Sequence, residues 1–108
     1  MAIFRVGASG DDPLEAAAAF YREDVPRLVG HQEGHLMLVF PPADHTHRAW
    51  RAAAVQQLAR HHAPHRVNAV ASDDEPAIAA AARYFGAAPA ITGHYLRLDG
   101  EGAELVVG

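Results

Sequence analysis

The stretch RVNAVASDDEPAIAAAARYFGAAPAITGHYLRLDG, residues 66–100, has an apolar segment at each end and an alanine-rich segment between them. Residues 66–71 form a short, branched apolar run, which is typical of a buried strand. Residues 91–100 indicate a second strand, and residues 75–85 between them have the pattern of a helix. A strand, a helix and a strand at this spacing predict a parallel crossover unit.

Two apolar runs before this unit predict two further strands. Leu36–Phe40 contains five apolar residues without alternation, which indicates a strand covered on both faces. Residues 2–6 form the other run. Each run is followed by a predicted helix: one begins at Pro13, behind the capping residue Asp12, and the other extends over about residues 46–62.

Four strands that alternate with three helices predict an α/β fold over residues 1–108, a single domain with three layers. Its sheet is expected to be four-stranded and mostly parallel, with three right-handed crossover helices. Pro26 is expected to break or kink the first helix, because its ring removes an amide donor and clashes with the preceding turn. Residues 104–107 are expected to extend the last strand or to pair with a neighbour.

Composition and charge narrow the classes of protein. The chain is 50% hydrophobic and 20% charged, as a globular protein is, and no apolar run approaches the ~20 residues of a membrane span. No membrane partner is therefore expected. The absence of cysteine and of a secretory signal predicts a cytoplasmic location. A formal net charge of -4 argues against a nucleic-acid partner.

Several short motifs resemble the C-terminal half of a short-chain dehydrogenase/reductase. They lie at residues 35–40, 58–60, 63–64, 66–70, 78–85, 91–93 and 98–100. The more specific ones are RVNAV at 66–70 and the TG of 92–93 followed by the DG of 99–100. The resemblance implies a Rossmann-like half-fold and a truncated, degenerate relative of that family.

The catalytic pair of that family has no counterpart here. A tyrosine and a lysine four residues later transfer protons in the family, and the resemblance places these roles at about Asp44 and Arg48. All nine basic residues of the chain are arginines, and an arginine stays protonated at any working pH. The missing pair argues against enzymatic activity.

The loop after the first predicted strand, GASG at residues 7–10, resembles the family's phosphate-binding loop only in part. Asp11, Asp12 and Pro13 replace the glycines that would approach a pyrophosphate, and two carboxylates would repel it. No cofactor is therefore expected. A residual nucleotide-binding module that uses Ser9 and Gly10 remains an alternative.

Polar residues gather in the loops that follow the predicted strands, where ligands bind in parallel sheets. The candidates for a ligand site at this edge are Ser9, Asp44, His45, His47, Ser72 and Asp73. They allow a small metal-dependent or acid–base enzyme as an alternative function. Capping of helix N-termini by the acids is the favoured interpretation.

A second histidine group, His61, His62 and His65, allows a zinc site, because imidazoles are good zinc ligands. Pro64 interrupts the helical register that would align His61 with His65, and there is no cysteine. We therefore favour a solvated cluster near a helix C-terminus and expect no metal site.

Self-association is the favoured hypothesis for function. A four-stranded fragment of a larger sheet leaves an edge strand that is prone to pairing. In the family, the helices that correspond to residues 13–29 and 46–62 form a bundle between subunits, and Ala49, Trp50 and Ala53 are candidates for that interface. The first hypothesis is thus a non-catalytic homo-oligomer, with a dimer expected, that scaffolds or regulates.

Overall fold

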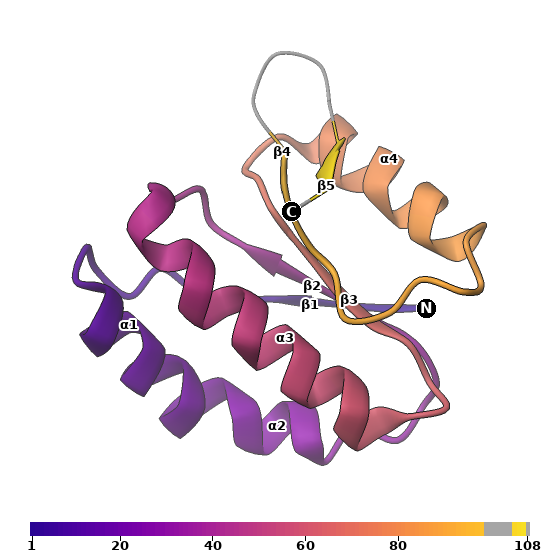
Figure 1. The fold of residues 1–108 in the computed structure, drawn as a ribbon, viewed down its shortest axis with the longest axis horizontal. Helices are drawn as coiled ribbons and strands as arrows, with labels where there is room; N and C mark the ends of the chain where they lie inside the picture. Colours follow the sequence, from indigo (N-terminus) through magenta and orange to yellow (C-terminus); the bar gives the residue numbers. More distant parts are fainter. Residues whose placement is uncertain (99–104, 108) are drawn as a thin grey trace.

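A sheet runs through the molecule and carries helices on both faces (Figure 1). The computed structural model describes residues 1–98 and 105–107. Four parallel strands lie side by side in sequence order: β1 (Ala2–Arg5), β2 (Leu36–Phe40), β3 (Val67–Ala71) and β4 (Tyr95–Leu98). The predicted four-stranded, mostly parallel sheet is confirmed. A short fifth strand, β5 (Leu105–Val107), pairs antiparallel with β4.

Three helical connections join the parallel strands, as predicted. The first contains α1 (Pro13–Ala19), a π-helical turn (Phe20–Asp24) and α2 (Val25–Val29). The second contains a short 3-10 turn (His45–His47) and α3 (Arg48–His62), and the third is α4 (Glu75–Gly86). No helix in the described part of the chain has both the length and the apolar character of a membrane span.

The helices divide between the two faces of the sheet, so the predicted three layers are confirmed. On one face, Leu36 and Leu38 pack in a cluster with residues of α1–α2 and α3. On the other face, Met37 and Val39 pack with Ile78 and its neighbours on α4. The parallel strands follow one another across the sheet in sequence order, so the hand of each crossover depends only on the face that its helix covers. Because α4 lies on the opposite face from α1–α2 and α3, the third crossover has the opposite hand to the first two. The expectation that all three crossovers are right-handed is therefore wrong.

The two central strands are buried along their whole length, as their apolar runs predicted. All five residues of β2 and all five of β3 are shielded from solvent. Every side chain of these strands therefore meets a helix layer or a neighbouring loop, whichever face it points to.

The first helical connection continues past Pro26, so the expected break is replaced by a local widening. Val25 donates its N–H to the carbonyl oxygen of Phe20, five residues back. In a regular helix, the ring of Pro26 would clash with the carbonyl of Arg22. The π-helical turn over Phe20–Asp24 lets the helix accommodate the proline with a bulge.

A buried amide side chain fixes the start of β4. Asn68 is 2% exposed; its Nδ2 donates to the carbonyl oxygen of Ile91 at 3.0 Å, and its Oδ1 accepts from the N–H of His94 at 3.1 Å. The N–H of Val67 donates to the hydroxyl of Thr92 at 3.0 Å. RVNAV and the TG of 92–93, which carried part of the family resemblance, thus meet at the β3–β4 junction, whereas the DG of 99–100 lies outside the described residues.

Two further contacts complete this junction. Gly93 has a φ of 79°, a conformation that favours glycine, and donates its N–H to the carbonyl oxygen of Val67 at 2.7 Å. Arg66 donates from Nη1 to the carbonyl oxygens of Phe85 and Ala88 at 2.7 and 2.8 Å. The two bonds of Arg66 satisfy carbonyls at the end of α4 and hold that end against β3.

We predict that Asn68→Leu destabilises the fold, because it leaves a part-buried carbonyl and a part-buried N–H without partners, at up to about 1–3 kcal/mol each. The free energy of unfolding, measured by urea denaturation, is expected to fall accordingly. Gln32→Leu, at an exposed amide in the turn before β2, is the control and is expected to change it by less than about 0.5 kcal/mol. Equal effects from the two variants would contradict the structural role of Asn68.

Candidate functional site

The loops at the carboxyl ends of β1, β2 and β3 line several hollows in the described part of the chain, none of which contains all of the predicted residues, and two of these hollows are relevant to the site. The first has a volume of about 230 Å³ and includes Ser9, Asp44 and His47 in its lining. The second has a volume of about 260 Å³ and includes Ser72 and Asp73. His45, the sixth predicted residue of this edge, lines neither hollow. The predicted ligand edge is thus divided among separate hollows.

Aspartates at this edge cap helical segments, as the favoured interpretation predicted. Each carboxylate accepts from a backbone N–H near the segment's start: Asp12 from Glu15 at 2.8 Å, Asp44 from Thr46 at 3.0 Å and Asp74 from Ala77 at 3.1 Å. Hydrogen bonds from the hydroxyl and the N–H of Thr46 hold the pKa of Asp44 below its ordinary value. Asp44 is therefore ionised at neutral pH and has no proton to donate.

His47 is a structural residue in this arrangement. Its side chain is 4% exposed, and its Nδ1 accepts from the indole N–H of Trp50 at 3.1 Å. Because an indole nitrogen only donates, the proton of a neutral His47 lies on Nε2, which donates to the carbonyl oxygen of Asp11 at 3.0 Å. Both ring nitrogens are engaged, so His47 has neither a lone pair for a metal nor a free position for proton transfer.

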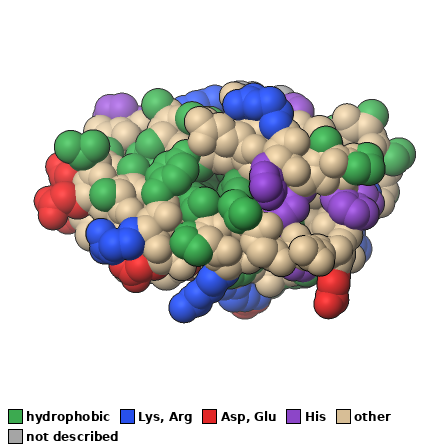
Figure 2. Space-filling view, turned by 90° about the horizontal axis from the view of Figure 1, so that it is seen from below, with side chains coloured by type: hydrophobic (Ala, Val, Ile, Leu, Met, Phe, Trp, Pro, Cys, Tyr) green, Lys and Arg blue, Asp and Glu red, His purple; other side chains and the backbone are tan. Residues whose placement is uncertain are grey.

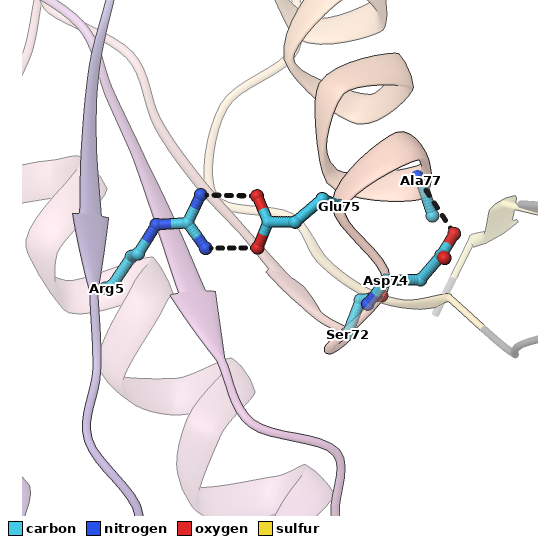
Figure 3. A network of polar contacts seen from close by, with 5 residues as sticks. All are labelled: Arg5, Ser72, Asp74, Glu75 and Ala77. Carbon is cyan, nitrogen blue, oxygen red and sulfur yellow. Dashed lines mark hydrogen bonds and ion pairs between the residues drawn. The ribbon is translucent and has the colours of Figure 1, made fainter.

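The loop after β3 is held by polar contacts that also reach the edge strand (Figure 3). The N–H of Asp74 donates to the hydroxyl of Ser72 at 3.0 Å. Arg5 on β1 makes two parallel hydrogen bonds of 2.9 Å to the carboxylate of Glu75 at the start of α4. Ser72 therefore stabilises the turn after β3. The ion pair between Arg5 and Glu75 connects β1 to α4.

Sequence reasoning did not find Arg51, which is 4% exposed and lines the first hollow. It lies one helical turn after His47 and one turn before Val55, and both neighbours are also buried. This register, at intervals of four residues on the inward face of α3, was the signal that would have revealed it.

The residues of the first loop do not fit a nicotinamide dinucleotide. The carboxylate of Asp12 accepts the N–H of Glu15, one of the first amides of α1, where a bound pyrophosphate would need to accept. A Cβ added at Gly7 or Gly10 would meet nothing within 4 Å, so neither glycine provides a tight backbone cradle.

The second histidine group lies at the opposite edge of the sheet. His61 and His65 are exposed, but His62 is 8% exposed and donates from Nε2 to the carbonyl oxygen of Leu28 at 2.8 Å. The expectation of a solvated cluster is therefore wrong for His62, because it closes the contact between α3 and α2. Within residues 1–98 and 105–107, no three histidine or acidic side chains are placed to hold a metal ion.

The three interface candidates on α3 differ in exposure. Ala49 and Ala53 are exposed, whereas Trp50 is half-buried. The Trp50 ring packs against Phe20 at 5.6 Å and Phe40 at 5.8 Å between ring centroids. Trp50 thus anchors α3 to the core of its own chain, and the two alanines remain on the surface.

The parallel sheet, its helices on both faces and the loops at its carboxyl edge define a Rossmann-like α/β protein. The family model of SDR-like proteins, described as short chain dehydrogenase-like protein, matches residues 4–98. The match covers most of the 108 residues, so the chain belongs to this family, as its motifs predicted. No curated protein and no solved structure was found to match the chain.

We predict that His62 makes stability depend on pH. Burial is the main cause that lowers its pKa below the ordinary value of 6.5. The unfolded chain then binds more protons than the folded chain between the two pKa values, so stability is lost as the pH falls through 6.5. His62→Gln keeps an N–H donor for the carbonyl of Leu28 but cannot titrate, and is expected to flatten the profile of unfolding free energy against pH.

The control for this measurement is His45→Gln, at an exposed histidine at the other edge of the sheet. It is expected to leave the pH profile of the wild-type protein unchanged. A profile for His62→Gln as steep as that of the wild-type protein would contradict the role of His62.

Proposed function

We propose that this chain is a non-catalytic, self-associating member of its family that scaffolds or regulates. Two features support the non-catalytic part. The positions that the family motif assigns to tyrosine and lysine hold Asp44 and Arg48, and Asp44 already caps the turn before α3. Lysine, which could lower the pKa of a phenol at that position, does not occur in the chain.

The observation that carries the self-association is the exposed apolar face of the first helical connection. Leu14 is 80% exposed, Tyr21 41% and Val29 42%. Figure 2 shows hydrophobic side chains gathered in the centre of the view on the side where α1 and α2 lie. An apolar group of this kind on a small domain is typical of a contact surface.

The face of α1–α2 is continuous with the exposed part of α3. The hydroxyl of Tyr21 donates to Oε1 of Gln57 at 3.1 Å and joins the two helices. Ala49 and Ala53 lie exposed on α3, and their small side chains let another helix approach closely. We propose that a second copy of the chain covers this surface about a two-fold axis, so that four helical segments pack together in a homodimer.

The sheet edge is the competing surface. Among the described residues, β1 has one neighbouring strand, β2, and Met1 and Ile3 at this edge are 52% and 46% exposed. An open edge of this kind pairs readily with another strand. Variants on α3 distinguish the two modes, because they leave β1 unchanged.

The proposed setting is the cytoplasm, without a nucleic-acid partner. The absence of cysteine supports the first point, because a chain of 108 residues in an oxidising compartment commonly relies on disulfides. The formal net charge of -4 supports the second, because a phosphate backbone attracts proteins with a positive surface.

We predict that Ala53→Glu converts the dimer to a monomer, because it places a charge in the middle of the proposed helical interface. Light scattering coupled to size-exclusion chromatography measures the change in mass. Ala79→Glu is the matched control: Ala79 is exposed in the middle of α4, on the opposite face of the sheet. It carries the same helix-propensity cost and is expected to leave the dimer intact.

Three results would contradict the proposed function. A monomeric wild-type protein at the highest soluble concentration would contradict self-association. A dimer that survives Ala53→Glu would exclude the helical surface and favour the edge of β1. Hydride transfer by the purified protein, tested with nicotinamide cofactors, would overturn its non-catalytic character.

A further inference from the structure

Arg51 is a buried cation. Its place in α3, four residues from His47 and four from Val55, turns its side chain inward, where it is 4% exposed. A guanidinium keeps its charge at any pH that the protein meets. Burial of a charge is unfavourable unless acceptors and a counter-ion replace the lost water.

The partners of Arg51 satisfy only one end of the guanidinium. Its Nη1 donates to the carbonyl oxygen of Pro41 at 2.8 Å and to the hydroxyl of Tyr95 at 3.2 Å. Its Nε is shielded from solvent and has no hydrogen-bond partner. Among the described residues, no carboxylate forms an ion pair with Arg51. Nη2 also makes no hydrogen bond in the described part of the chain and, unlike Nε, is not shielded from solvent.

Aromatic rings compensate for part of the buried charge. The guanidinium carbon lies 4.7 Å from the ring centroid of Phe40 and 5.6 Å from that of Trp50. Such cation–π contacts stabilise a cation, but they accept no N–H in the plane of the guanidinium. Nη2 lies in that plane and is the donor of Arg51 that a carboxylate can meet.

The surroundings of Arg51 have charges of both signs. The hollow of about 230 Å³ is lined by buried Arg51 and by the exposed residues Ser9, Asp11 and Asp44. The cation therefore lies at the inner end, and two carboxylates and a hydroxyl lie towards solvent. A phosphate with two negative charges would meet repulsion from both aspartates, whereas a group that donates hydrogen bonds would be attracted.

We infer that this hollow binds a small organic acid whose carboxylate meets Nη2 of Arg51 and whose neighbouring ammonium or hydroxyl group meets Asp44 and Asp11. The volume lies below the range of about 300–1,000 Å³ found for drug-sized ligands and is appropriate for a compact molecule such as an amino acid or a hydroxy acid. The site needs neither self-association nor hydride chemistry. It makes the domain a sensor of a small metabolite.

The test uses L-serine, acetate and inorganic phosphate as probes, with binding followed by amide chemical shifts in NMR spectra. We expect saturable binding of L-serine, binding of acetate at least about tenfold weaker because it lacks the donor group, and no saturable binding of phosphate. Arg51→Met keeps an apolar side chain of similar length and is expected to weaken L-serine binding at least about tenfold. Arg60→Met, at an exposed arginine of the same helix, is expected to leave binding unchanged.

A second variant decides the matter if Arg51→Met does not fold. Asp44→Asn keeps an oxygen that caps the turn but removes one charge towards solvent. It is expected to weaken L-serine binding and to strengthen acetate binding. The inference is overturned if no probe binds saturably, if Arg51→Met or Asp44→Asn binds L-serine as the wild-type protein does, or if phosphate binds more tightly than L-serine.

Discussion

The buried amide of Asn68 is the contact on which the C-terminal part of the sheet depends. Its two bonds, to the carbonyl of Ile91 and the N–H of His94, determine where the chain turns into β4. The register of β4 against β3, with Tyr95 opposite Ala69, follows directly from that point. The same register brings the hydroxyl of Tyr95 to Arg51, so one amide in the core also positions a group at the site.

The layers of the fold were largely predictable, because an apolar run without alternation has few solutions other than a strand buried on both faces. Leu36–Phe40 is such a run, Val67–Ala71 is one apart from Asn68, and both strands formed as predicted. The face on which α4 lies was not predictable. An apolar stripe on a helix shows that it packs, but both faces of β2 and β3 are apolar, so the periodicity of α4 does not distinguish between them.

The capping aspartates of the candidate site were foreseeable, since Asp12 and Asp74 directly precede a proline or an acidic residue at the start of a helix. The burial of His47 and Arg51 was harder to foresee, because the types of these residues predict exposure and only their register with Val55 indicates an inward position. Tertiary contacts account for the difference: the rings of Phe40 and Trp50 cover Arg51, and Trp50 and Asp11 occupy both nitrogens of His47. In each case one partner comes from another segment of the chain, Phe40 for Arg51 and Asp11 for His47.

The π-helical turn in the first connection has a consequence for the rotational phase of that helix. Phe20 and Leu28, which are 2% and 1% exposed, are eight residues apart and both point into the core. In a regular helix, eight residues turn through about 800°, which would leave the second side chain about 80° away from the first. The π-helical turn contains one more residue than a regular turn and removes most of this offset. Phe20 and Leu28 therefore both face the sheet.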